Sequence, residues 1–321
     1  MVFYLEESAT AYTLAFGVEG LSVSLFEYKA GAPGEIDCAS AAGWRMAMSI
    51  PLRLDKSREP WLICARALDL ALNRGPVTQW RLQGTGIIPG GVVNAASFIS
   101  GPVAPGSLVS IFGVHLAASA AAAPAGASEL AGVTVEITGV HGDRHKLPLV
   151  YASQQQVNAR LPREISLGEA TLELAGAEGR ARVTVRVERA TPGLFRQGLP
   201  YRPVVGFVLR RGAEGAAQRE PLWSCNETGS CTTRWIAPPA TGEELRLALM
   251  GTGVGLAGAP GIRVWLGPEP LTVDAVETLP AQPGVEEIVL RSSRDFALRG
   301  CQALQLEASG RKSVQGWICL R

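Results

Sequence analysis

The sequence predicts an all-β protein built from two Ig-like β-sandwich domains in tandem, preceded by a smaller β-rich N-terminal segment. Three observations lead to this fold class. Gly and Pro are abundant, at 37 and 21 of 321 residues, as in chains with many turns. Several short segments alternate apolar and polar residues with the period of two that a strand requires. Helical periodicity is poor, whereas an apolar content of 47% excludes global disorder.

A chain of this length can hold two or three domains, and we place them at 1–87, 88–190 and 191–321. The first range is a β-rich segment that begins abruptly and without an export signal. We therefore expect it to be part of a domain whose beginning is missing.

The N-terminal segment contains three recognisable patterns. Residues 12–28 resemble two strands separated by glycines, and residues 44–54 alternate like one further strand. Residues 61–72 fit a helix by composition, whereas their first part, WLICARAL, also fits a strand.

The central range shows clearer strand signals. Residues 107–113 (SLVSIFG) form an apolar run typical of a buried strand, and residues 117–126 are predicted to be a loop of small residues. Val133, Val135 and Ile137 alternate with polar residues, which predicts one buried and one solvated face. Short strands separated by frequent turns are typical of an Ig-like sandwich.

The C-terminal range repeats this order. LRLALMGTGVG (245–255) corresponds to the apolar run at 107–116, and IRVWLG (262–267) corresponds to VTVEITG. Residues 279–291 match 151–162, and the sequence ends in a predicted hairpin. Residues 198–239 are expected to be a long connection between the two units.

Six cysteines favour an oxidising compartment. Cys301 and Cys319 are symmetric about Gly310, so a hairpin turning there would place them opposite each other. Cys225 and Cys231 enclose a short turn, which leaves Cys38 and Cys64 as a third pair by elimination. Reduced cytosolic cysteines are the alternative, and the absence of a Cys-x-x-Cys spacing argues against zinc ribbons and thioredoxin-like redox sites.

Charge and hydropathy exclude two classes of partner. The net charge is +1 and the 30 basic residues are dispersed, so neither nucleic acid nor an anionic membrane surface is an expected partner. Residues 82–128 lack charged side chains, but prolines, glycines and polar residues interrupt them, so membrane insertion is not expected.

Two motifs resemble cofactor or metal sites. Gly253-Val-Gly255-Leu-Ala-Gly258 matches G-x-G-x-x-G, but the sequence continues directly into a strand, so no helix N-terminus is expected to hold a phosphate. His141, Asp143 and His145 lie at a predicted hairpin tip, where an exposed polar turn is the favoured interpretation over a metal site. We therefore predict no cofactor and no metal.

Catalytic constellations are also lacking. His115 ends an apolar strand with no Asp or Cys near it in sequence, and no G-x-S-x-G motif is present. The carboxylate pairs are interpreted as solvated turn charges, and they are Glu6-Glu7, Glu243-Glu244 and Glu286-Glu287. We predict that the chain is not an enzyme.

Aromatic residues in the inter-unit connection are the candidate ligand contacts. Tyr201, Trp223 and Trp235 could stack on sugars or contact another protein. The alternative for the two tryptophans is packing over the Cys225–Cys231 loop.

The order of motifs resembles the Solibacter-type C-terminal domain family, which consists of paired Ig-like units related to IPT/TIG domains in exported bacterial proteins. The resemblance covers about residues 88–321 and departs from the pattern at the HGDRHK turn and the Cys225–Cys231 loop. It implies an architecture and a cell-surface or extracellular location, and no active site. The motifs that carry it are GVVNAASF (91–98), PVAPGSLVSIFG (102–113), VYASQQQVNARLP (150–162), ATPGLF (190–195) and MGTGVG (250–255).

Two functional hypotheses are favoured over a third, which is an enzyme with an unrecognised site in residues 1–87. The first is a non-catalytic, exported structural or interaction module of a bacterial surface protein, with other domains or surface proteins as partners. The second is a carbohydrate-binding accessory module of a secreted polysaccharide-degrading system, with glycans as partners.

Overall fold

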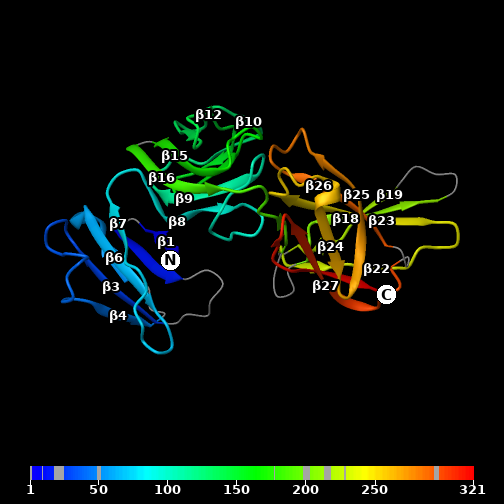
Figure 1. Cartoon of the computed structure of the whole chain (residues 1–321), viewed down its shortest axis with the longest axis horizontal. Helices are drawn as coiled ribbons and strands as arrows, with labels where there is room; N and C mark the ends of the chain where they lie inside the picture. The colour runs from blue at the N-terminus through cyan, green and yellow to red at the C-terminus, as the bar shows by residue number, and fades with distance from the viewer. Residues whose placement is uncertain are drawn as a thin grey trace.

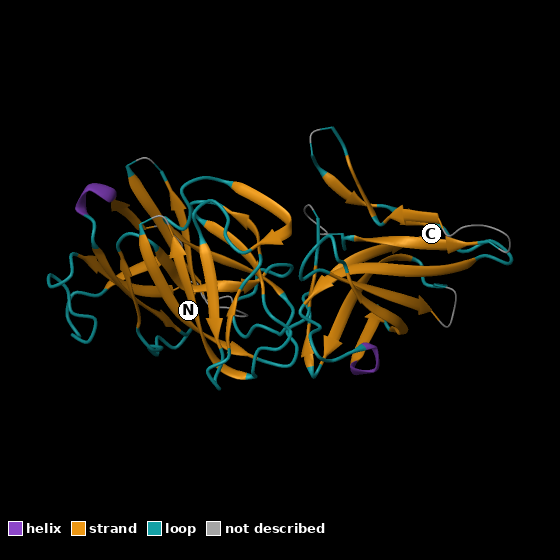
Figure 2. Ribbon diagram, turned by 90° about the horizontal axis from the view of Figure 1, so that it is seen from above, coloured by secondary structure: helices purple, strands orange, loops and turns teal. Residues whose placement is uncertain are grey.

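The computed structural model describes residues 2–8, 10–17, 25–48, 52–176, 178–197, 203–212, 218–227, 229–292 and 296–321. Strands make up most of these residues, and the helical elements among them are two single turns of 3-10 helix, η1 (Lys56–Arg58) and η2 (Ala259–Gly261) (Figure 2). The predicted all-β fold class is confirmed. Three β units are present: the N-terminal and central units lie next to each other, and the C-terminal unit lies beyond them along the long axis of the molecule (Figure 1).

The N-terminal unit is a seven-stranded sandwich of two sheets. The strand order β1-β2-β5 faces β4-β3-β6-β7, a three-on-four arrangement shared by Ig-like and fibronectin type III sandwiches. The strands are β1 (Val2–Glu7), β2 (Ala11–Gly17), β3 (Leu25–Gly31), β4 (Arg45–Met48), β5 (Leu52–Asp55), β6 (Trp61–Leu68) and β7 (Thr78–Leu82).

Apolar side chains from both sheets of this unit form one shared core. Tyr12 and Leu14 from one sheet pack against Trp61, Ile63 and other apolar side chains of the second sheet. The ambiguous segment at 61–72 is a strand over its first eight residues, because β6 lies centrally between β3 and β7. Residues 44–54 form two strands in different sheets, β4 and β5, rather than the single strand predicted.

The central unit is a nine-stranded sandwich. Its five-stranded sheet has the order β10-β13-β14-β9-β8, and its four-stranded sheet has the order β12-β11-β15-β16. The strands are β8 (Gly86–Asn94), β9 (Leu108–Val114), β10 (Ala121–Ala127), β11 (Thr134–Thr138), β12 (Arg144–Lys146), β13 (Leu149–Ala152), β14 (Gln156–Arg160), β15 (Gly168–Gly176) and β16 (Gly179–Val187).

Its core contains the predicted inward residues. Val133, Val135 and Ile137 are fully buried, as the alternation requires. The predicted loop at 117–126 is wrong in its second half, because residues 121–127 form edge strand β10, paired irregularly with β13. Apolar contacts also cross between units, since Ile88 and Val114 of this unit join the N-terminal core.

The C-terminal unit is one continuous sheet that folds over its own core. The main path is β19-β18-β23-β26-β25-β24-β27-β29-β22, with β17 paired to β23, β28 paired to β27 and a separate hairpin of β20 and β21. The strands are β17 (Gly193–Leu194), β18 (Gly206–Arg211), β19 (Gln218–Pro221), β20 (Trp223–Cys225), β21 (Cys231–Thr233), β22 (Trp235–Ile236), β23 (Glu244–Thr252), β24 (Ile262–Leu266), β25 (Glu269–Thr278), β26 (Glu286–Ser292), β27 (Gly300–Ala308), β28 (Arg311–Lys312) and β29 (Gly316–Leu320).

The predicted repeat is confirmed by strand pairing. β23, β24, β26, β27 and β29 pair among themselves as β9, β11, β14, β15 and β16 do, with one difference. In the central unit β12 and β13 are separate strands in opposite sheets, whereas in the C-terminal unit one long strand, β25, pairs with both β24 and β26. Its register shift between Val273 and Ala275 lets the strand pass from one face of the sandwich to the other.

The predicted connection at 198–239 belongs largely to this fold. β18 adds to β23 over six residue pairs, and β22 adds in parallel to β29. The expectation of a long linker is therefore wrong for these segments.

All six cysteines are paired as predicted. The disulfides join Cys38 to Cys64, Cys225 to Cys231 and Cys301 to Cys319. Cys301 and Cys319 are direct cross-strand partners in the β27–β29 hairpin. The two-residue turn at Ser309 and Gly310 has φ of 50° and 79°, the left-handed conformation that short hairpins favour.

Candidate functional site

The predicted aromatic contacts occupy different environments. Trp223 begins the small β20–β21 hairpin and packs partly buried against the C-terminal core, whereas Trp235, in edge strand β22, is 51% exposed beside Cys319. Tyr201 lies outside the described residues. A ligand platform of these three residues stays a prediction.

The G-x-G-x-x-G segment packs closely against the backbone that connects the central and C-terminal units. A Cβ on Gly253 would lie 2.3 Å from the Thr191 carbonyl oxygen, and one on Gly255 would lie 2.5 Å from that of Arg189. Both glycines therefore permit a close approach of two backbones. The segment ends in the single turn η2 and then β24, so it does not form the helix that a dinucleotide site needs.

The HGDRHK turn is the β11–β12 hairpin. The Ser166 hydroxyl and amide both donate to Asp143, at 2.7 and 3.0 Å, and these bonds lower the pKa of Asp143 to about 2. Asp143 thus fixes the hairpin to the loop before β15. No group of three His, Cys, Asp or Glu side chains suited to a metal occurs in the described ranges.

One carboxylate pair differs from its predicted role as solvated charges. Glu286 is 4% exposed where β26 begins, next to Pro283 and Gly284, which contact the central unit, and Glu287 is ion-paired to Arg219 at 2.6 Å. Burial raises the pKa of Glu286 to about 7, although the Val254 amide donates to it at 3.1 Å. Both glutamates lie in β26, which pairs with β23 on one side and β25 on the other, and not in a solvated turn.

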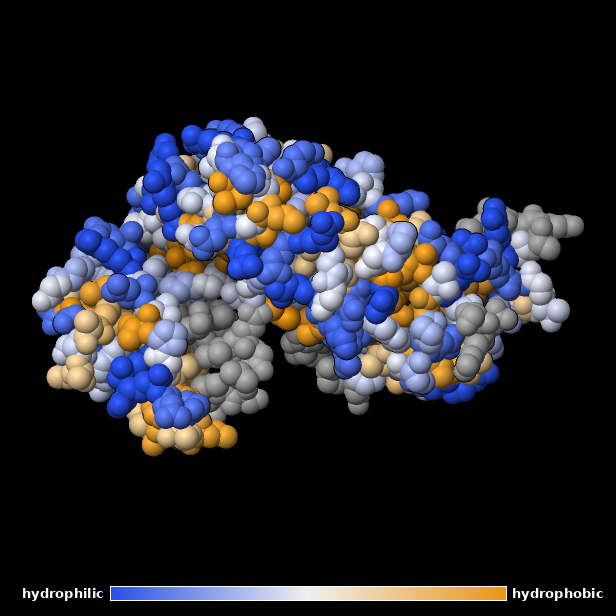
Figure 3. Space-filling model, viewed as in Figure 1, coloured by the Kyte–Doolittle hydropathy of each residue, from blue (hydrophilic) through white to orange (hydrophobic). Residues whose placement is uncertain are grey.

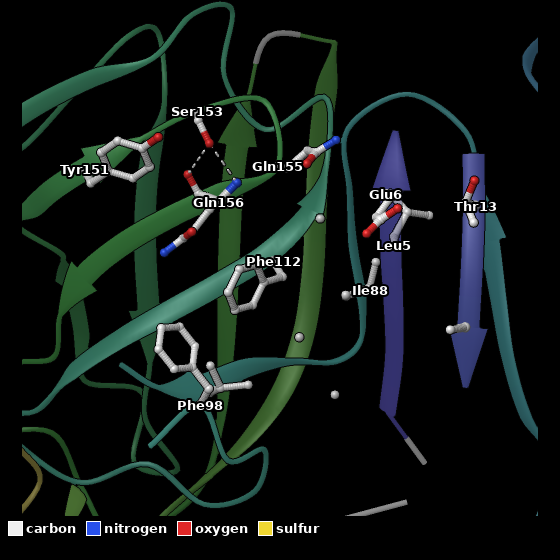
Figure 4. A pocket seen from close by; sticks show the side chains of 15 residues that line it. Leu5, Glu6, Thr13, Ile88, Phe98, Phe112, Tyr151, Ser153, Gln155 and Gln156 are labelled. Carbon is white, nitrogen blue, oxygen red and sulfur yellow. Dashed lines mark hydrogen bonds between the residues drawn. The ribbon is translucent and has the colours of Figure 1, made fainter. Parts of the chain in front are cut away.

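A cavity lies between the N-terminal and central units. It has a volume of about 680 Å³, a size typical of ligand sites. β1 and β2 of the N-terminal unit form one wall, with Leu5, Glu6 and Thr13, and β8 contributes Ile88 (Figure 4). We call this cavity the inter-unit groove.

The opposite side of the groove belongs to the central unit. β9 contributes Phe112, the loop before β14 contributes Ser153 and Gln155, and β14 contributes Gln156 (Figure 4). Phe112 and Gln156 are cross-strand partners, so their side chains share one sheet face. The Gln156 amide is oriented by donating to the Asn158 side chain at 2.8 Å.

Phe98 completes the aromatic side of the groove. Its ring centroid lies 6.2 Å from that of Phe112, and its side chain remains 59% exposed. Its φ is +57°, a left-handed conformation that is uncommon for a bulky residue. The turn is held by Asn94, whose side-chain oxygen accepts from the amides of Ala96 and Ser97 and whose carbonyl accepts from that of Phe98.

A second set of contacts ties the same two units together. The hydroxyl of Tyr12, in β2, lies 2.8 Å from Nε2 of His115 and 3.2 Å from Oε2 of Glu59. The His115 Nδ1 lies 3.3 Å from Glu178 of the central unit. His115, which follows β9, therefore has a structural role between the units.

Sequence reasoning missed the groove because its lining comes from five separate segments. The GVVNAASF motif (91–98) ends in Phe98, but nothing in the motif identifies this residue as part of a cavity. No helix in the described part of the chain is long and apolar enough to cross a bilayer.

Comparison with known proteins adds little to this description. No protein-family model matches the chain, and no curated protein matches it. Among solved structures, the FN1–FN3 domains of chicken CNTN1 are similar at 10% identity, over 78% of this chain and 91% of that one, with a TM-score of 0.17. A tetra-tandem repeat from the extending region of a large adhesion protein is similar at 11% identity, over 96% and 94%, with a TM-score of 0.19. Such scores assign neither topology nor function, so the fold rests on the strand order above.

Proposed function

We propose that the chain is a non-catalytic, exported structural and interaction module of a bacterial surface protein. The observation that carries this proposal is that three consecutive β units, two of which contain disulfides, are joined through buried contacts. Disulfides persist in oxidising compartments, and all six cysteines are paired. Hydrophilic residues are scattered over the visible face of every unit, which fits a module surrounded by water (Figure 3).

The resemblance to the Solibacter-type C-terminal domain family supports the same proposal. Its motifs lie at structurally demanding positions, such as the turn at Asn94 and the close approach at Gly253. We infer that the central and C-terminal units form the paired Ig-like units of that family, and that the N-terminal sandwich precedes them in a longer surface protein.

Thiol mapping and surface labelling test this function. Non-reducing peptide mass spectrometry of the chain isolated from its native host should find the pairs Cys38–Cys64, Cys225–Cys231 and Cys301–Cys319. Antibodies against the chain should label intact cells or the culture medium. Six free thiols, or labelling only after lysis, would contradict export.

A further inference from the structure

We propose that the inter-unit groove binds an uncharged oligosaccharide, with sugar rings stacked on Phe98 and Phe112 and sugar hydroxyls bonded to Gln156 and Thr13. This inference rests on the proposed function, because it names the partner that such a module would hold. It places the binding site away from Trp223 and Trp235.

The aromatic side of the groove is shaped for stacking. Phe98 and Phe112 lie next to each other at an interplanar angle of 40°, and Phe98 keeps more than half of its surface exposed. The negative face of an aromatic ring attracts the partly positive C–H groups that line one face of a sugar. Two adjoining rings therefore offer positions for successive sugar units.

The backbone of Phe98 supplies an independent argument. A left-handed φ of +57° is strained for a bulky residue, and such strain persists where the surroundings enforce it, often at functional sites. Here the Asn94 turn enforces it, and the result is a large apolar ring held out over a cavity. A glycine would meet the backbone requirement at lower free energy, so the ring itself needs an explanation.

The polar lining defines the charge of the ligand. Thr13, Ser153, Gln155 and Gln156 supply hydroxyl and amide groups, which can both donate and accept hydrogen bonds as sugar hydroxyls do. Of the described residues that line the groove, Glu6 alone carries a formal charge. An aliphatic ligand would strip water from these amides without replacing their hydrogen bonds, which disfavours a lipid.

Strand pairing disfavours an extended peptide on the groove floor. β9 lies between β14 and β8, and β14 lies between β13 and β9, so both floor strands have paired edges on each side. A peptide that adds to a sheet needs a free edge. Recognition on β9 and β14 therefore uses side chains. β1 and β8, which also line the groove, are the end strands of their sheets, so the test below includes a peptide that could add to these edges.

The test uses the full chain and four probes in isothermal titration calorimetry. Cellohexaose, xylohexaose and mannohexaose are the neutral probes, and a decapeptide of alternating Val and Thr represents an extended peptide. We expect at least one neutral hexasaccharide to bind with millimolar or tighter affinity. Phe98→Gly should weaken that binding about tenfold or more, the effect of losing one stacking ring.

Leu72→Gly is the matched control. Leu72 is also exposed and also has a positive φ, of 63°, but it lies in the turn after β6 and does not line the groove. Both glycine variants relieve the same backbone strain, so neither should lower the melting temperature, and Leu72→Gly should bind as the natural chain does. Gln156→Ala should also weaken binding and tests the polar side without touching the turn.

Four results would overturn the inference: binding of no neutral hexasaccharide, binding of the peptide alone, equal loss in Phe98→Gly and Leu72→Gly, or loss in Trp235→Ala instead. Each of these is compatible with correctly paired cysteines and surface labelling, so failure here leaves the proposed export and module function standing.

Discussion

Glu286→Gln should remove a pH-dependent instability from the C-terminal unit. Glu286 is buried at the start of β26, and desolvation raises its pKa from the usual 4.5 to about 7. Because the folded state holds the proton more tightly than the unfolded chain, the carboxyl contributes its full stability below pH 4.5. That stability is lost as the pH rises through about 7.

The magnitude follows from the shift. A rise in pKa from 4.5 to about 7 corresponds to roughly 3 kcal/mol of unfolding free energy between pH 4 and pH 8. Glutamine keeps a carbonyl that can accept from the Val254 amide, as Oε2 does at 3.1 Å, and it carries no charge to desolvate. Glu286→Gln should therefore be more stable than the natural chain at pH 8, by up to about 3 kcal/mol, and similar to it at pH 4.

The assay is urea unfolding followed by tryptophan fluorescence at several pH values between 4 and 8, chosen to bracket the shift. The quantity compared is the difference in unfolding free energy between the variant and the natural chain. Glu277→Gln, an exposed position on β25, is the control and should show no such dependence. A constant difference across the whole pH range would refute the reasoning.

Three further substitutions test the joints between units. Thr252→Val should destabilise the chain by about 1–3 kcal/mol in thermal unfolding, since it leaves the buried Leu108 amide without the hydroxyl that accepts from it at 2.8 Å; Thr252→Ser should restore most of the loss. Tyr12→Phe should cost about 1 kcal/mol by removing the hydroxyl between His115 and Glu59, and hydrogen exchange should quicken in β2 more than in β18. Asn94→Ala should cost about 1–3 kcal/mol and also weaken oligosaccharide binding, because it releases the Phe98 turn; unchanged binding would show that the turn is held in another way.

Alternating patterns predicted strands well and sheet membership poorly. Val133, Val135 and Ile137 were assigned correctly because a half-buried strand shows its period locally. Residues 44–54 also alternate, yet they divide between two sheets, and alternation contains no information about which neighbour a strand pairs with. The Ala-rich edge strand β10 was missed because small residues produce no contrast between its two faces.

The disulfide pairings differ in how directly they can be predicted from the sequence. Cys301 and Cys319 could be paired from hairpin symmetry, because the connecting turn is local. Cys38 and Cys64 come from a loop and from β6, and only elimination joined them. The groove is harder still to predict, since Thr13 of the N-terminal unit meets Phe98 and Phe112 of the central unit only through the contact between the two units.

Asn94 shows why the joints, rather than the repeated sandwiches, are the place to look for function. Its side-chain oxygen holds the turn that presents Phe98, and its side-chain amide donates to the Thr191 carbonyl at 2.8 Å, in the segment that leads to the C-terminal unit. A Cβ on Gly193 would lie 2.3 Å from that same side-chain oxygen, and one on Gly253 would lie 3.1 Å from the amide nitrogen. Three motifs that are far apart in sequence, GVVNAASF, ATPGLF and MGTGVG, therefore converge on one buried side chain. A hydrophobic core needs only apolar volume, so packing alone does not explain a buried asparagine here. Its role is to connect two features: the same side chain fixes the turn that orients the Phe98 ring and bonds to the segment that leads to the C-terminal unit.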